Sequence, residues 1–230
     1  MQKERLLRPV FLIGFMGSGK TSVGKALARL ADMEFLDTDE MIVEAQQMPI
    51  TQIFAEQGET YFRDLETQLL RDLEKRMITE NADEKSCGIA AFGGDENRHD
   101  RDCSSSRISS ADSNEGGNNH EGGKREKSEG SRSCVISVGG GMPMREENRA
   151  IMRRIGTVIY LKAEPDTLVQ RLSGDTTRPL LQGGDLRQRI LTLMEKRGSI
   201  YAQASHIQLY TDGMSVQQAA RSIARQLKNS

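Results

Sequence analysis

The sequence predicts an α/β fold of three layers, in which helices cover both faces of a five-stranded parallel sheet. Short apolar runs alternate along the 230 residues with longer segments of helical periodicity. These runs are continuously apolar, as expected for strands that are buried on both faces. The expected strands are Val10–Ile13, Glu34–Leu36, Cys134–Val138, Thr157–Leu161 and His206–Tyr210.

The segments between the strands carry helical patterns. The longest has Leu65, Leu69, Leu73 and Met77 at intervals of four residues, a spacing typical of a face that packs on a core. Ser215 to Gln218 has the form of a capping box and predicts the start of the last helix. The expected helices are Lys20–Leu30, Glu40–Gln46, Thr51–Ala55, Glu59–Met77, Arg145–Arg153, Asp166–Leu172, Leu186–Ala204 and Ser215–Leu227.

Composition narrows the class of protein. The 32 basic and 33 acidic residues nearly cancel, so no overall positive charge would attract nucleic acid or an anionic membrane. The first residues lack the apolar core of a secretory signal, and no run reaches the roughly 20 apolar residues of a membrane span. We expect a cytoplasmic protein.

The cysteines give little indication of a metal site. There are three, and none forms a CxxC pair. A zinc site at Cys87, His99, Cys103 and His120 is the alternative, but the spacing of these residues is irregular. We expect free thiols and solvated imidazoles.

One segment differs in composition from the rest of the chain. From Gly93 to Ser133 there is no aromatic residue, and Ile108 is the one aliphatic side chain larger than alanine. Such a stretch buries too little apolar surface to offset the entropy of ordering it. We expect it to be disordered within a low-complexity insertion at 79–133, either as an inert surface segment or as a docking arm.

The strongest motif is Gly14-Phe-Met-Gly-Ser-Gly-Lys-Thr21, which follows the first expected strand and opens the first helix. It fits G-x-x-x-x-G-K-[ST], the phosphate-binding loop. In such a loop, backbone N–H groups hold phosphate oxygens, Lys20 reaches the β- and γ-phosphates and Thr21 binds Mg²⁺. The alternative is an ordinary strand–turn–helix in which the glycines only turn the chain.

Two acids, Asp37 and Asp39, follow the second strand, at the sheet edge where ligands gather in open α/β folds. One carboxylate is expected to hold the water shell of the metal and the other to orient an acceptor hydroxyl. An acid cluster before Glu40 is also typical of a helix N-cap, so that alternative stays open.

Several arginines and glycines extend the pattern. Arg63 stands near the start of a helix that opens at Gly58, where a cation is electrostatically disfavoured unless an anion binds it. Gly139–Gly141 follows the third strand and leaves the backbone open to close approach by a ligand. Arg171 and Arg178 belong to a polar, mobile segment suited to closing over a nucleotide. Arg197, taken alone, is interpreted as a solvated surface charge.

Together these residues resemble the shikimate kinase family, small P-loop kinases related in fold to the nucleoside monophosphate kinases. The resemblance covers nearly the whole chain outside 79–133. It implies a single P-loop kinase domain at 1–230, with a substrate-binding helical segment at 40–77 and a lid at 173–186. It also implies phosphorylation of the 3-hydroxyl of shikimate by ATP, with Mg²⁺ as cofactor.

The resemblance assigns roles to residues. Lys20, Asp39 and Arg178 would be catalytic, and Thr21 and Asp37 would hold the metal, Asp37 through water. Arg63 and Arg197 would bind the shikimate carboxylate, and Arg171 would stack on adenine. The ATP site would comprise Gly17, Ser18, Gly19, Lys20, Thr21, Ser22, Arg171 and Arg178. The shikimate site would comprise Asp39, Phe54, Phe62, Arg63, Gly139, Gly140, Gly141 and Arg197.

Two other functions stay open. Another small-metabolite kinase, such as a gluconate-type kinase, would also use arginines for a carboxylate. The other is a nucleotide-binding regulatory protein that has kept the phosphate loop and lost transfer, and such a protein would need no acceptor pocket. We expect shikimate and ATP as partners, no nucleic acid or membrane, and a monomer.

Overall fold

The sheet matches the prediction in number and direction of strands. The computed structural model describes residues 8–87, 133–173 and 185–229. Within them lie β1 (Val10–Ile13), β2 (Glu34–Asp37), β3 (Cys134–Ser137), β4 (Thr157–Lys162) and β5 (Ile207–Tyr210). All pairings are parallel, in the order β2-β3-β1-β4-β5. The predicted five-stranded parallel sheet is confirmed.

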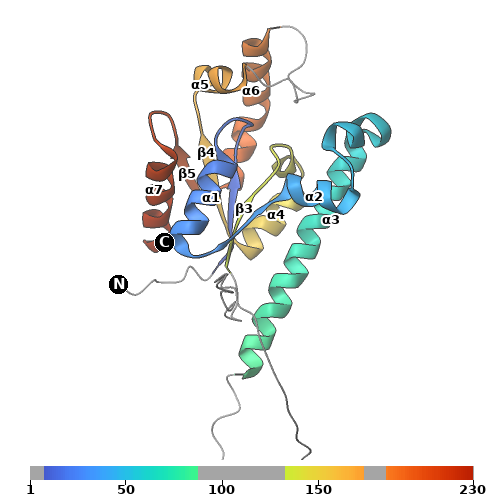
Figure 1. The fold of residues 1–230 in the computed structure, drawn as a ribbon, viewed down its shortest axis with the longest axis vertical. Coiled ribbons are helices and arrows are strands. Elements are labelled where there is room, and N and C mark those ends of the chain that lie inside the picture. The colour runs from blue at the N-terminus through green and yellow to red at the C-terminus, as the bar shows by residue number, and fades with distance from the viewer. Residues whose placement is uncertain (1–7, 88–132, 174–184, 230) are drawn as a thin grey trace, which may run out of the picture.

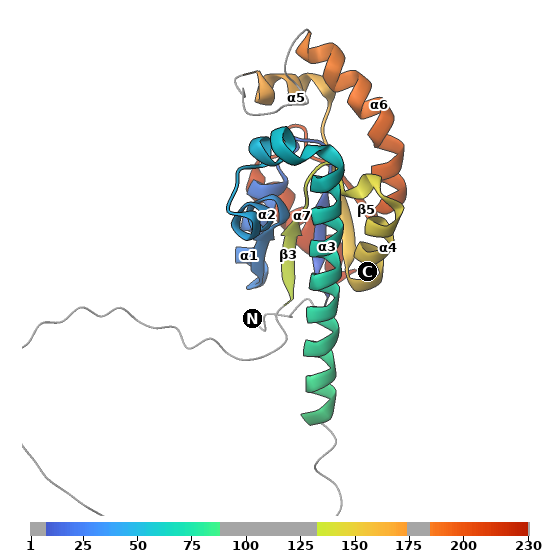
Figure 2. The same ribbon diagram turned by 90° about the vertical axis from the view of Figure 1, so that its right-hand side faces the viewer.

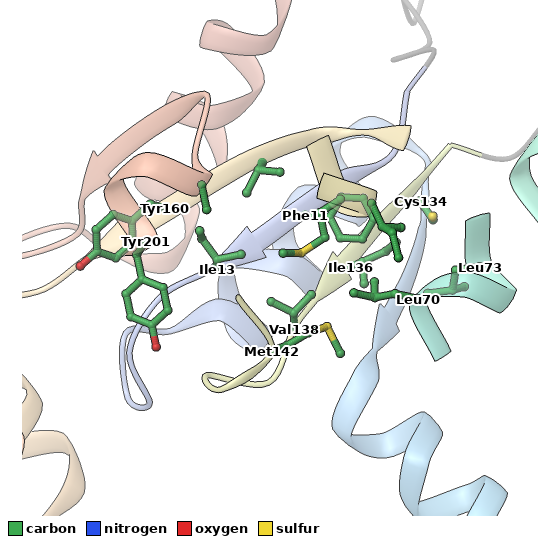
Figure 3. Packing of buried hydrophobic residues seen from close by; sticks show 14 residues of the cluster. Phe11, Ile13, Leu70, Leu73, Cys134, Ile136, Val138, Met142, Tyr160 and Tyr201 are labelled. Carbon is green, nitrogen blue, oxygen red and sulfur yellow. The ribbon is translucent and has the colours of Figure 1, made fainter. Parts of the chain in front are cut away.

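Helices cover both faces of the sheet (Figures 1 and 2). On one face, α1 (Lys20–Ala31) and α7 (Val216–Lys228) share a core with Val10 and Leu12. On the other, α3 (Ile50–Cys87), α4 (Glu146–Ile155) and α6 (Leu186–Ala204) pack on Phe11 and Ile13, and Figure 3 shows part of this core. Successive β1 side chains thus enter opposite cores, which explains why the strand is apolar throughout.

The remaining elements are short. They are α2 (Thr38–Gln46), the 3₁₀ helix η1 (Met142–Met144) and α5 (Pro165–Leu172). The capping box at Ser215 and Gln218 is present and begins α7 as predicted. Each side chain of this box accepts a hydrogen bond from the backbone N–H of the other residue, and these N–H groups have no partner within the helix itself.

The long helix has the predicted break but extends further than predicted. Thr51–Ala55 and Glu59–Met77 were expected as two helices, and α3 (Ile50–Cys87) consists of two helical stretches that meet at a kink at Gly58, whose φ and ψ are not helical. The side chains that face the core also differ from the predicted stripe. Phe62, Glu66, Leu70 and Leu73 are buried, while Leu65, Leu69 and Met77 are only partly buried.

The topology brings the loops after β1, β2, β3 and β4 to one edge of the sheet. Parallel strands end at the same edge, and β1 lies between β3 and β4. Ligands of open α/β sheets bind outside this edge, where connections leave in opposite directions. The phosphate loop, the acids and the triple glycine all follow strands that end here.

Some predictions fall mainly outside the described residues. These are the disorder of Gly93–Ser133, most of the insertion at 79–133 and most of the lid at 173–186, with Arg178. In the described ranges, no helix has both the length and the apolar character required to cross a bilayer.

Candidate active site

The loop between β1 and α1 has backbone geometry that glycine permits. Gly14, Gly17 and Gly19 all have positive φ, at 145°, 77° and 91°. A Cβ on Gly14 would lie 2.5 Å from the carbonyl oxygen of Leu161, so the loop packs directly on β4. The loop then enters α1, whose first turn presents the positive end of the helix dipole.

Lys20 lies over this loop. Its Nζ donates to the carbonyl oxygens of Gly14 and Phe15 at 3.0 and 3.1 Å. Ser18 is buried, and within the described residues its hydroxyl has no hydrogen-bond partner. The ammonium group and the loop N–H groups therefore gather positive charge at one place, which suits a phosphate chain.

Asp37, the last residue of β2, connects two elements of the site. Asp37 is the N-cap of α2: its Oδ1 accepts from the backbone N–H of Asp39 at 3.1 Å. Its Oδ2 accepts from the hydroxyl of Thr21 at 3.0 Å. The N-cap alternative is thus correct for Asp37, but the same side chain also joins the end of β2 to the start of α1.

A cavity of about 450 Å³ contains the predicted nucleotide residues. Its lining includes the loop, both acids, Arg171, and residues from the β5–α7 connection that sequence reasoning missed, namely Thr211, Met214 and Ser215. Arg171 donates to the carbonyl oxygen of Gly17 at 3.0 Å, which holds its guanidinium beside the loop. All of the predicted ATP residues except Arg178 line this cavity; Arg178 lies outside the described residues.

A second cavity, of about 540 Å³, contains the predicted substrate residues. All eight of them line it, together with Met16, Val43, Pro49, Ile50, Thr51 and Glu66. Phe54 and Phe62 form an aromatic pair with ring centroids 4.9 Å apart. Arg197 lies in this lining and is half-buried, so its interpretation as a solvated surface charge is wrong.

Arg63 is a cation of this second cavity that two glutamates hold. Its Nη1 donates to Glu66 at 2.9 Å, and its Nη2 and Nε donate to Glu59 at 2.9 and 3.3 Å. These bonds use three of the five guanidinium N–H groups. Among the described residues no bond uses the other two, one on each terminal nitrogen, so a carboxylate can still be bound through both. Burial opposes the charge on Arg63, yet the two glutamates raise its pKa.

Glu66 was not predicted, and the pKa of its carboxyl is strongly shifted. Its side chain is fully buried, and burial raises its pKa to about 7 although Arg63 opposes the shift. Asp39 adds a repulsive contribution. A Cβ on Gly139 would lie 2.6 Å from Asp39 Oδ1 and 2.9 Å from Glu66 Oε1, so the two carboxylates approach one point above the glycine.

The two cavities meet. Met16, Asp39 and Gly140 line both of them, so Asp39 stands between the phosphate loop and the arginines. A glycine-rich phosphate loop that adjoins an acceptor pocket through one carboxylate is the site of a P-loop phosphotransferase. This is the class of enzyme that the fold and the site define.

Comparison with known proteins identifies the family. The family model described as "Shikimate kinase" matches residues 16–94 and 125–228, and the gap between these ranges lies inside the predicted insertion. The chain belongs to the shikimate kinase family, a family of ATP-dependent phosphotransferases.

Individual relatives agree with this assignment. The chain is 34% identical to a shikimate kinase of Persephonella marina over 96% of this chain and 100% of the relative. It is 31% identical to a shikimate kinase of Bacillus cereus over 92% and 93%. Among solved structures, a shikimate kinase from Acinetobacter baumannii in complex with shikimate matches at 26% identity with a TM-score of 0.70, covering 97% of this chain and 94% of that one.

Proposed function

We propose that the protein transfers the γ-phosphoryl group of ATP to the 3-hydroxyl of shikimate, giving shikimate 3-phosphate and ADP. The observation that carries this proposal is the position of Asp39, which lines both cavities. A hydroxyl that accepts a phosphoryl group must lie at the boundary between a nucleotide site and an acceptor site. The family to which the chain belongs supports the choice of shikimate as acceptor.

The second cavity suits the chemistry of this acceptor. Shikimate carries one carboxylate and a ring with hydroxyl groups. Arg63 and Arg197 would bind the carboxylate, with charge-assisted hydrogen bonds worth about 1.5–3 kcal/mol each. Phe54 and Phe62 would contact the ring, and the Gly139–Gly141 backbone would bind a ring hydroxyl. This arrangement would direct the 3-hydroxyl toward Asp39.

The residues at the loop fit a magnesium ion. Thr21 and Asp37 supply a hydroxyl and a carboxylate oxygen 3.0 Å apart in the nucleotide cavity, and hard oxygen donors are those that Mg²⁺ prefers. Thr21 would bind the ion directly and Asp37 through water. Bound Mg²⁺ would neutralise charge on the β- and γ-phosphates.

The chain's own groups would then position the reactants. Lys20 and the loop N–H groups would hold the phosphates, Arg171 would stack on the adenine, and Arg178 would reach the phosphates from the lid at 173–186. Asp39 would accept a hydrogen bond from the 3-hydroxyl and take its proton as the oxygen bonds to the γ-phosphorus. The bond from that phosphorus to the β-phosphate oxygen breaks, and ADP leaves with the electron pair. Because such transfer is loose, Asp39 contributes mainly through placement.

An ADP-release assay across a panel of hydroxy acids tests the proposal. ADP release should depend on shikimate and not on gluconate, and phosphorus NMR should place the product phosphate on the 3-oxygen. ADP release that is the same with and without shikimate, while another acid of the panel stimulates it, would refute the assignment.

Light scattering on the same preparations tests the expectation that the protein is a monomer.

A further inference from the structure

The triple glycine after β3 has most of its backbone groups already bonded inside the protein. Gly139 donates its N–H to the Thr38 hydroxyl at 3.0 Å, and its carbonyl accepts from Met142 at 3.0 Å. The Gly141 carbonyl accepts from Met144 at 3.0 Å. Within the described residues, the N–H groups of Gly140 and Gly141 have no such partner.

The remaining carbonyl, that of Gly140, is bound by a side chain from a distant helix. The hydroxyl of Tyr201, on α6, donates to it at 2.5 Å. The Gly140 carbonyl and the Gly141 N–H belong to one planar trans peptide and point in opposite directions. A hydroxyl that fixes the carbonyl therefore fixes the direction of the Gly141 N–H as well.

Tyr201 is itself held firmly. It is 1% exposed, and its ring lies beside that of Tyr160, with centroids 5.2 Å apart (Figure 3). Burial raises the pKa of its phenol to about 12 although Arg197 opposes the shift, so the group keeps its proton and remains a donor. The hydroxyl does not line either cavity.

The same hydroxyl lies close to an arginine of the second cavity. Arg197 precedes Tyr201 by one helical turn on α6. A Cβ on Gly140 would lie 3.7 Å from the Tyr201 hydroxyl and 3.9 Å from Arg197 Nη1. One side chain therefore adjoins both the glycine backbone and a cation of the acceptor pocket.

We propose that Tyr201 is a positioning residue for the acceptor pocket. Its hydroxyl holds the Gly140–Gly141 peptide so that the Gly141 N–H faces the substrate, and it keeps this backbone beside Arg197. The inference rests on the proposed function and adds to it a residue that touches neither substrate.

Tyr201→Phe tests this role, because it removes the hydroxyl and keeps the ring. The Michaelis constant for shikimate should rise by about tenfold, as expected for a buried carbonyl left without its donor, while that for ATP changes by less than about twofold. The wild-type enzyme should have a higher kcat/KM for shikimate than for whichever analogue, 4-deoxy or 5-deoxy, lacks the hydroxyl that the glycine backbone binds. In Tyr201→Phe this difference in kcat/KM should be smaller. A loss of packing alone would not change this preference.

Tyr160→Phe is the matched control, since the Tyr160 ring adjoins that of Tyr201 and, within the described residues, its hydroxyl makes no hydrogen bond to the triple glycine. It should leave both Michaelis constants near those of the wild type. A folded Tyr201→Phe enzyme with an unchanged Michaelis constant for shikimate, or with equal rises for both substrates, would overturn the inference.

A second measurement uses the wild-type chain and so does not depend on folding of the variant. In ¹⁵N-glycine-labelled protein, the amide signals of Gly140 and Gly141 should shift when shikimate is added. If neither signal responds, the inference is wrong even where shikimate is phosphorylated. If shikimate is neither bound nor phosphorylated, the proposed function itself fails.

Discussion

At the scale of single residues, the acceptor cavity depends on a guanidinium that two carboxylates already hold. Glu59 and Glu66 bind Arg63 from opposite sides, and Phe62 and Phe54 lie under it, with the guanidinium carbon 5.5 and 6.0 Å from their ring centroids. This restraint lowers the entropy that Arg63 loses on binding an anion. It also requires the planar fork of arginine rather than a single ammonium group.

Arg63→Lys therefore tests recognition of the substrate carboxylate. We expect the Michaelis constant for shikimate to rise by about 10- to 100-fold, corresponding to roughly 1.5–3 kcal/mol, with little change for ATP. Steady-state kinetics with each substrate varied in turn measures this. Arg71→Lys is the control, because Arg71 lies on the same helix and pairs with Glu147 at the surface. Equal effects on both substrates would contradict the assignment.

Glu66 makes stability depend on pH. Its pKa is raised from 4.5 to about 7 by burial, so the folded state binds this proton more tightly than the unfolded state. The resulting stabilisation is complete below about pH 4.5 and is lost as the pH rises through 7. Glu66→Gln cannot titrate and should flatten this decline, which we expect to amount to roughly 1–3 kcal/mol.

Urea unfolding at a series of pH values from 4.5 to 8 measures this slope, and Glu59→Gln is the matched control. Glu59 also pairs with Arg63, but its side chain is 56% exposed. Its variant should therefore keep the slope of the wild type. An identical slope in the wild type and in Glu66→Gln would show that Glu66 titrates normally.

The sequence indicated some of these residues and not others. Lys20, Thr21 and Asp39 were predictable because their spacing from the strands is that of a known phosphate site.

Glu66 was not predictable in this way, because a charged residue on a helix is normally on the solvent side. Its position between the buried Phe62 and Leu70, four residues from each, was a usable signal. Tyr201 resembled an ordinary core residue, and only coordinates place its hydroxyl on Gly140.

At the scale of elements, Gly58 sets the direction of the chain within α3. It has φ 83° and ψ 170°, a conformation that is essentially restricted to glycine. Phe54 lies before it and Phe62 after it, so the kink brings both rings to one wall of the acceptor cavity. The glycine was a visible break in the sequence. Periodicity alone could not give the direction of the turn.

Gly58→Ala should destabilise the protein by roughly 1–3 kcal/mol and raise the Michaelis constant for shikimate. A Cβ at this position meets nothing within 4 Å, so the cost arises from backbone strain alone. Denaturant unfolding, together with kinetics, measures both effects. Gly198→Ala is the control, because Gly198 lies within α6 and also has open space around it. This substitution should raise the free energy of unfolding by roughly 0.5–1 kcal/mol. A stabilised Gly58→Ala would contradict this account of α3.

At the scale of the whole molecule, a single sheet brings distant segments together. The loops after β1 and β2, the kinked helix α3, the triple glycine after β3 and the helix α6 all contribute to two adjoining cavities. The fold class was predictable from continuous apolar strands and amphipathic helices. The strand order was not, because it depends on crossovers that hydrophobic periodicity does not specify. The convergence of Asp39, Arg63 and Arg197 was predicted through the family resemblance and not from periodicity.

The turnover of Asp39→Asn is the most direct test of the central claim, that this carboxylate joins the two cavities at the point of phosphoryl transfer. We expect kcat to fall by at least about 100-fold, with the Michaelis constants for ATP and shikimate within a few-fold of the wild type. Glu40→Gln, an exposed acid one residue away on α2, should keep its turnover. A folded Asp39→Asn enzyme with near-normal kcat would contradict the account.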